Sequence, residues 1–250
     1  MESGAWNRCE TAVKPEAWKK MSVLTILLLA LAECATSGCT MTYSAKPITA
    51  RVVDAQTKEP LEGVVVVAHW ELQGGLEGRY RQGDITVLEA VTDSSGTFRF
   101  PGWGPKKIRR GRPVNARLQE LDPEMLFFKN GYRFMAVHNY KHTDAQMAES
   151  LRFSDYDGQT IEMKKFEGTL SEYARDLAQR EGLLLDPLFT ACEWRQLPLL
   201  LEALGQQQKA FEVAGLGNIA NSYNVLLLNE AAEEKAGCGS VHTFIEEHVH

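Results

Sequence analysis

Five cations gather just after a tryptophan near the middle of the chain. The glycines and prolines around them predict that residues 101–113 form a loop. In a protein of net charge −6, such a loop could bind anionic lipid headgroups or acidic glycans. The alternative is a loop that carries charge only to stay solvated. The cations are Lys106, Lys107, Arg109, Arg110 and Arg112, and they follow Trp103.

Aromatic side chains also flank the polar, glycine-bearing segment 73–83. Trp70 precedes this segment, Tyr80 lies within it, and Trp103 stands beside the cationic loop. Exposed aromatic rings with a polar edge could stack against sugars. In the alternative interpretation, Trp70 belongs to the core and Trp103 only fixes the loop.

The C-terminal tail contains possible metal ligands. His242 and Glu246 would share one side of a helix, and His248 and His250 would share one side of a strand. Imidazole and carboxylate groups suit Zn²⁺ or Cu²⁺. A solvated terminus explains the same residues more simply, so no metal site is predicted.

No known catalytic motif is present in the chain. The sequence lacks G-x-S-x-G, H-E-x-x-H, C-x-x-C and a phosphate-binding loop. Asp155 and Asp157 precede Gly158 as in the start of a calcium loop, but the later ligands are missing. These residues therefore predict a turn, and the chain as a whole predicts neither an enzyme nor a cofactor.

The bulk composition is that of a globular protein with one or two domains. Of the 250 residues, 44% are hydrophobic and 24% are charged. Nucleic acid is not expected as the main partner, because phosphate binding needs a basic surface.

The N-terminal segment has the pattern of a secretory signal. The apolar run 23–32 is too short to cross a bilayer, which takes about 20 residues. Lys19 and Lys20 precede the run, and small residues follow it. Residues 1–38 are therefore expected to be a signal peptide.

The end of that segment, Thr36-Ser37-Gly38-Cys39, resembles a bacterial lipobox, although Thr36 stands where leucine is usual. The resemblance implies that Cys39 is lipidated and anchors the protein to a membrane, with residues 39–46 as a tether. Two alternatives remain. Cleavage near Ala32 would release a soluble secreted or periplasmic protein, or the run could be a buried helix of a cytosolic protein.

Cys192 and Cys238 would remain after the leader is removed. In an oxidising compartment, an even pair of cysteines predicts a disulfide. The alternative is two unrelated buried thiols.

Between residues 47 and 166, short apolar segments alternate with turn residues. This pattern predicts an antiparallel β-sandwich of about seven strands. The expected strands are 48–54, 64–70, 85–92, 97–100, 125–128, 132–138 and 160–166.

Three stretches of this region resemble the carboxypeptidase regulatory-like domain, a small transthyretin-like sandwich. They are ITARVVDAQTKEPLEGVVVVAHW, TDSSGTFRF and FFKNGYRFM. Zinc carboxypeptidases that carry this domain use a separate catalytic domain with an H-x-x-E motif, which no histidine here matches. Ring-opening hydrolases of the transthyretin type end in Tyr-Arg-Gly-Ser, unlike this chain. The matching residues are Asp54, Thr57, Pro60, Leu61, Gly63, Val64, Val66, Thr92, Asp93, Gly96, Phe98, Phe100, Gly131 and Tyr132.

After Phe166 the apolar period becomes helical. Capping boxes at 169–172 and 190–193 predict the starts of two helices, and a third is expected over 218–234. Residues 167–236 should therefore form a small helical bundle, followed by a flexible tail over 237–250.

The sequence as a whole predicts an envelope lipoprotein, anchored on the periplasmic side of a bacterial membrane. It would act without catalysis, as a binding or structural module for an envelope protein or glycan. One alternative is a periplasmic glycan-binding accessory protein that uses Trp103 and Tyr80. Another is a hydrolase with an unrecognised site near His138, His142 or Asp144.

Lipidation of Cys39 is directly testable. In bacteria fed a radioactive fatty acid, the full chain should incorporate the label and its Cys39→Ala variant should not, because the thiol is the acceptor. Cys34→Ala is the matched control and should retain the label. A labelled Cys39→Ala protein would refute the assignment.

Overall fold

Strands dominate the fold, and helices follow them, as the sequence predicts. The computed structural model describes residues 42–78, 80–108, 112–113, 115–140, 150–185, 192–220, 237–240, 243–244 and 247. Within these residues, the strands are β1 (Thr42–Ala45), β2 (Ile48–Asp54), β3 (Val65–Gly74), β4 (Tyr80–Val91), β5 (Thr97–Phe100), β6 (Trp103–Lys107), β7 (Arg117–Leu118), β8 (Glu124–Phe128), β9 (Met135–Val137), β10 (Leu151–Arg152) and β11 (Thr160–Met163). The helices are the 3₁₀ turn η2 (Leu76–Gly78), α3 (Leu170–Leu185), α4 (Pro198–Val213) and α5 (Gly217–Ala220).

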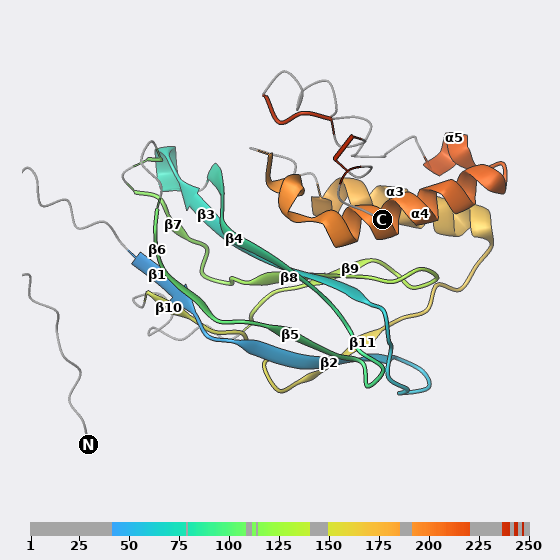
Figure 1. Ribbon diagram of the computed structural model, residues 1–250, viewed down its shortest axis with the longest axis horizontal. Helices are drawn as coiled ribbons and strands as arrows, with labels where there is room; N and C mark the ends of the chain where they lie inside the picture. Colours follow the sequence, from blue (N-terminus) through green and yellow to red (C-terminus); the bar gives the residue numbers. More distant parts are fainter. Residues whose placement is uncertain are drawn as a thin grey trace, which may run out of the picture. The chain divides into compact units, whose positions relative to one another are not determined.

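The strands form three sheets, which Figure 1 shows below the helices. The central sheet has the order β4-β3-β8-β9, with β7 also paired to β3. Two three-stranded sheets, β10-β1-β6 and β11-β2-β5, supply the residues on the other side of the core. The described residues thus contain eleven strands rather than about seven. The pairs β1–β10 and β2–β11 are parallel, whereas the sequence pattern predicts an antiparallel arrangement.

The central sheet is covered on both faces, and strand β3 shows this most clearly. Val64, Val66 and Ala68 are buried in the core shared with β2, β5 and β11, while Val65 and Val67 are buried beneath the helices. A strand without a solvated face is expected to be a continuous apolar run, and residues 64–68 are all apolar.

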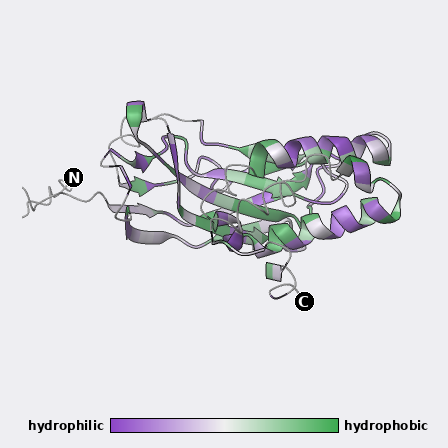
Figure 2. Cartoon of the chain, turned by 90° about the horizontal axis from the view of Figure 1, so that it is seen from above, coloured by the Kyte–Doolittle hydropathy of each residue, from purple (hydrophilic) through white to green (hydrophobic). Residues whose placement is uncertain are grey.

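Helix α3 begins at the capping box that the sequence predicts. The Thr169 hydroxyl accepts a hydrogen bond from the Glu172 backbone N–H at 3.3 Å, and the Glu172 carboxylate accepts one from the Thr169 N–H at 2.7 Å. One side of the helix then lies on the sheet, and Figure 2 shows polar and apolar bands along the helices. The buried apolar residues of α3 are Tyr173, Ala174, Leu177, Ala178 and Leu185.

Helix α4 starts later than predicted, because Glu193 does not cap it. Pro198 is its first residue, where the missing N–H costs nothing. A carboxylate from the sheet takes the place of a local cap: Glu89 of β4 accepts hydrogen bonds from the N–H groups of Leu199 (3.0 Å) and Leu200 (2.9 Å). Burial raises the pKa of Glu89 to about 7, and these two bonds oppose the rise.

Several residues behind the family resemblance hold turns. Asp93 Oδ1 accepts the N–H groups of Ser95 and Thr97, which closes the turn before β5. Asp54 Oδ1 accepts two N–H groups of its own turn, and its Oδ2 accepts the Tyr132 hydroxyl at 2.9 Å. Gly96 has φ +74°, and a Cβ there would lie 2.4 Å from the Val52 carbonyl oxygen, so only glycine fits.

Other segments differ from the sequence prediction because their partners are distant in the chain. Part of the expected tether, residues 42–45, forms β1, and part of the expected loop 101–113 forms β6, which pairs with β1. The expected loop 73–83 is largely a hairpin, since β3 and β4 pair as far as Gly74 and Tyr80. None of these pairings has a local sequence signal.

The chain end is also more ordered than a flexible tail where it is described. Cys238 and Phe244 are buried, and the Phe244 ring packs edge-on against Trp194 with centroids 5.4 Å apart. Cys192 and Cys238 form a disulfide, with Cα atoms 5.3 Å apart, which confirms the predicted pair. No described helix combines the length and apolar character needed to cross a bilayer.

The cap that Glu89 provides predicts the effect of a mutation. Glu89→Ala should lower the free energy of unfolding by about 1 kcal/mol, because two N–H groups at the start of α4 lose their acceptor. Urea unfolding at pH 8 measures the change. Glu59→Ala, which removes an exposed carboxylate, is the control. An unchanged midpoint in Glu89→Ala would contradict the role of the cap.

Candidate functional site

A charged cavity of about 320 Å³ lies where the central sheet emerges from beneath the helices. Strands β3 and β4 form its floor, β6 forms one wall, and the turn over residues 192–196 forms another. This turn precedes α4. The lining residues are Leu72, Asp84, Ile85, Lys106, Lys107, Arg112, Glu193 and Gln196. We call this cavity the charged pocket.

Strand β6 positions one cation of the pocket over an aromatic pair. The Lys106 ammonium donates a hydrogen bond to the Thr86 hydroxyl at 2.8 Å and lies 5.4 Å from the centroid of the Trp103 ring. Trp103 packs edge-on against buried Trp70, with centroids 5.3 Å apart. Trp70 thus belongs to the core, and Trp103, half-buried, fixes the base of β6.

Two further cations of the pocket have no counter-ion. Neither Lys107 nor Arg112 makes an ion pair with any residue in the described part of the chain, and the Lys107 side chain is exposed. Their donors are therefore open to a ligand. Gln196, also exposed, adds a neutral donor and acceptor on the opposite wall.

The carboxylates of the pocket are, in contrast, already engaged. Arg81 donates to Asp84 at 2.6 Å and pairs with Glu193 at 2.8 Å, and its Nε pairs with Glu71 at 3.2 Å. Glu193 also accepts the Asp84 backbone N–H. Burial and the charge of Asp84 raise the pKa of Glu193 to about 7, against the effect of Arg81.

A buried histidine lies behind these carboxylates. His69, only 1% exposed, has Nδ1 3.2 Å from Asp84 and Nε2 3.1 Å from Glu124. Burial favours the neutral ring, but the two hydrogen bonds and the two negative charges outweigh it and raise the pKa of His69 to about 10. The imidazolium is thus fixed as a structural cation, and neither ring nitrogen is free to act as a base.

Asp122 is a further buried carboxyl group beside this cluster. It is 1% exposed, and neither carboxyl oxygen has a hydrogen-bond partner among the described residues. Burial raises its pKa well above the usual range, although the positive charge of His69 opposes the rise. The negative charges of Asp84 and Glu71 act in the same direction as burial and raise the pKa of Asp122 further.

The structure brings together only some of the residues that the sequence singles out. Lys106, Lys107 and Arg112 line the charged pocket, and the Trp103 ring lies beneath Lys106, whereas Tyr80 is 61% exposed at the start of β4. Cys39, Arg109 and Arg110 lie outside the described residues, as do His142, Asp144 and the tail residues His242, Glu246, His248 and His250.

Three other residues that the sequence singles out are accounted for by local contacts. His138 Nε2 lies 3.5 Å from Glu124 at the edge of the buried cluster. Asp157 accepts the Thr49 N–H at 2.8 Å, and Asp155 accepts the Tyr140 N–H at 2.8 Å, so both carboxylates hold backbone around the turn. None of the described residues forms a group of three or more metal-ligating side chains.

The sequence prediction missed Arg81, Asp84 and Glu193. One signal was available: His69 interrupts the apolar run 64–70, and a polar residue at a buried strand position requires partners. The identity of those partners depends on the pairing of β3 with β4 and β8, which places Glu124 opposite His69.

Comparison with known proteins gives no family for this chain. No protein-family model and no curated protein matches it. Among solved structures, chlorocatechol 1,2-dioxygenase from Pseudomonas putida is 17% identical, with 49% of this chain and 61% of that chain covered and a TM-score of 0.24. A 9R-lipoxygenase from Cyanothece PCC8801 is 15% identical, with 82% and 34% covered and the same TM-score. The chain thus spans less than two thirds of either enzyme, and likeness this low assigns neither fold nor activity.

The buried imidazolium predicts a specific pH dependence. The folded pKa of His69, about 10, exceeds the ordinary 6.5, so the charged ring stabilises the folded state. This contribution to the free energy of unfolding is complete below pH 6.5 and is lost as the pH rises through 10. The total change in the free energy of unfolding is on the order of 5 kcal/mol. Nuclear magnetic resonance should show the His69 ring still charged at pH 8, with the signal assigned by its absence in His69→Gln. A ring that becomes neutral below pH 8 would contradict the network.

Proposed function

We propose that this chain is a non-enzymatic binding module for anionic ligands, held at the surface of a bacterial membrane. The observation that supports this function is the convergence of Lys106, Lys107 and Arg112 on one cavity, where Lys107 and Arg112 have no counter-ion among the described residues. The carboxylates beneath are already paired with Arg81, so the donors of Lys107 and Arg112 at the cavity favour an anion.

The dimensions and lining of the pocket suit a small acidic group. Its volume of about 320 Å³ lies at the lower end of the range for ligand sites. Guanidinium and ammonium donors bind carboxylate, sulfate or phosphate through charge-assisted hydrogen bonds. Leu72 and Ile85 add an apolar floor, which suits a ring or a short aliphatic segment. An acidic sugar has both features.

The membrane location remains a proposal from the sequence. A signal over residues 1–38 and a lipid on Cys39 would place the body in the cell envelope, where disulfides such as Cys192–Cys238 form. If cleavage is instead by an ordinary signal peptidase, the protein is a soluble periplasmic or secreted one, and the pocket is unaffected.

The transthyretin-like assignment is likewise part of the proposal. The turns at Asp54 and Asp93, and the two layers of strands around Trp70 and Phe127, support a carboxypeptidase regulatory-like sandwich as the core of residues 47–166. In this view, the short strands β6, β7, β9 and β10 are additions around that core.

Two observations bear on the alternatives. A glycan-binding accessory protein is supported by Tyr80, which is 61% exposed and available for stacking. A hydrolase would need a free general base at the pocket, and the two carboxylates that line it, Asp84 and Glu193, are both paired with Arg81. We therefore favour binding without catalysis.

Removal of the pocket cations should weaken binding of an acidic sugar. Lys107→Gln or Arg112→Gln should each reduce affinity for an oligogalacturonate about tenfold, because each variant loses a charge-assisted hydrogen bond. Isothermal titration calorimetry measures the change. Lys164→Gln makes the same charge change at an exposed position of the chain after β11 and is the matched control. Equal binding of neutral oligogalactose, or no effect of either variant, would refute the proposal.

A further inference from the structure

We propose that the end of the molecule at which β1 begins rests on an anionic membrane surface. We call this end the anchor-end surface and define it by Thr42, Leu76, Tyr80, Lys107 and Arg117. The inference deepens the proposed function and rests on its lipid anchor at Cys39. It adds the orientation of the body and the chemistry of the surface beneath it.

The length of chain before β1 limits where the anchor can be. Cys39 precedes Thr42 by three residues, which span about 11 Å at most when extended. A lipid on Cys39 would therefore hold Thr42 within that distance of the membrane interface. Because Thr42 pairs with Lys107 in the β1–β6 register, the same restriction brings the cationic end of β6 to the membrane.

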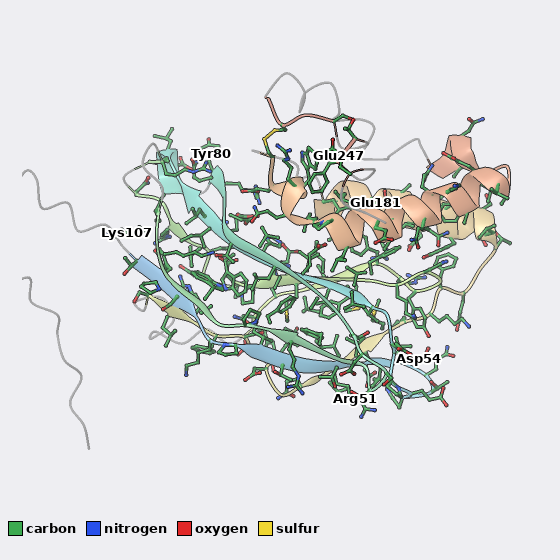
Figure 3. All side chains as sticks on the ribbon, viewed as in Figure 1. Arg51, Asp54, Tyr80, Lys107, Glu181 and Glu247 are labelled. Atoms are coloured by element: carbon green, nitrogen blue, oxygen red, sulfur yellow. A yellow bond between two sulfur atoms is a disulfide. The ribbon has the colours of Figure 1, made fainter. Side chains whose placement is uncertain are left out.

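The hairpin between β3 and β4 reaches the same end of the molecule. Asn115, in the chain that follows β6, accepts the Gly75 N–H at 3.0 Å and donates to the Gly75 carbonyl at 2.8 Å. This clamp fixes the tip of the hairpin beside the segment that leads away from Lys107. Figure 3 shows Tyr80 and Lys107 at the end of the structure where β1 begins.

The composition of the anchor-end surface matches that of a lipid interface. Leu76 is 79% exposed and Tyr80 is 61% exposed at the tip of the hairpin. A leucine can enter the acyl boundary while a tyrosine lies at headgroup level. Exposed Arg117 lies opposite Gln73, next to the tip, and exposed Lys107 lies at the same end of the molecule. Both cations attract anionic headgroups, and Glu77 is the acid within the tip.

This arrangement supplies a second signal beside the lipid. A lipid chain tethers the body without orienting it, whereas apolar and cationic side chains around the attachment point select one face. The exposed apolar residues Leu183 and Val213 lie on α3 and α4, outside the anchor-end surface. They provide controls of similar exposure.

Fluorescence quenching by brominated lipid tests this orientation. The full chain, extracted from bacterial membranes, would be reconstituted into vesicles of phosphatidylglycerol and phosphatidylcholine with brominated acyl chains. In Leu76→Trp, bromine should quench the emission of the new tryptophan. In Val213→Trp, the added emission should persist. An unquenched tryptophan at position 76, or equal quenching at both positions, would overturn the inference.

Charge removal provides a second, independent measurement. In the Leu76→Trp variant, Lys107→Gln combined with Arg117→Gln should lower the ratio of docked to undocked protein about thirtyfold. The emission of the tryptophan at position 76 should then return. The matched control is Arg99→Gln combined with Lys164→Gln, which should leave the quenching unchanged. Quenching that stays unchanged in both double variants would overturn the electrostatic part of the inference.

The fatty-acid label separates this inference from its premise. A labelled protein whose Leu76→Trp variant is unquenched retains its anchor, and only the orientation is wrong. A chain that takes up no label and leaves the membrane fraction refutes the anchor and the orientation together. Binding of oligogalacturonate in the Leu76→Asp variant shows that the pocket is intact in either case, because Leu76 does not line it.

Discussion

The central sheet has no solvated face over most of its length, and the arrangement of the other elements depends on this. Strand β3 contributes alternate side chains to two cores, one shared with the β1–β2 layer and one shared with the helices. The strands of the central sheet and helices α3 and α4 therefore differ in secondary structure, but they meet in a common core. The helices cover the face of the sheet that Val65, Val67, Leu126 and Phe128 would otherwise expose to water.

The charged cluster arises where this double cover ends. Along the helix-facing row of β3, Val65 and Val67 are followed by His69, and along β8, Phe128 and Leu126 are followed by Glu124. The side chains thus change from apolar to charged as the sheet leaves the helices. The buried charges are stabilised by one another, because His69 and Arg81 each lie between carboxylates. The cluster supports the floor of the charged pocket from below.

Local sequence signals predict the parts of this fold that depend on neighbouring residues. The capping box of α3, the turn at Asp93 and the buried run of β3 follow from residues a few positions apart. The start of α4 does not, because its cap, Glu89, comes from a strand more than 100 residues earlier. The strands β1 and β6 are short, and they depend on pairing with distant segments: β6 pairs with β1, and β1 also pairs with β10.

The same distinction applies to the candidate site. Lys106, Lys107 and Trp103 are visible in the sequence because they are adjacent and share a chemical type. Arg81, Asp84 and Glu193 are single charged residues in three segments, and a charged residue in a sequence is usually a solvated one. Their burial follows from the pairing of β3 with β4 and from the position of the turn before α4, neither of which a single sequence specifies.

The disulfide has a consequence for the timing of maturation. Cys192 is the direct neighbour of Glu193, whose carboxylate holds the Asp84 backbone and Arg81 at the pocket wall. A covalent bond from Cys192 to Cys238 therefore fastens that wall to the distant chain end. In a reducing compartment the fastening is absent, and it forms only when thiols are oxidised. Under the proposed function, the wall of the charged pocket would thus be fastened only after the two thiols are oxidised, later than synthesis of the chain.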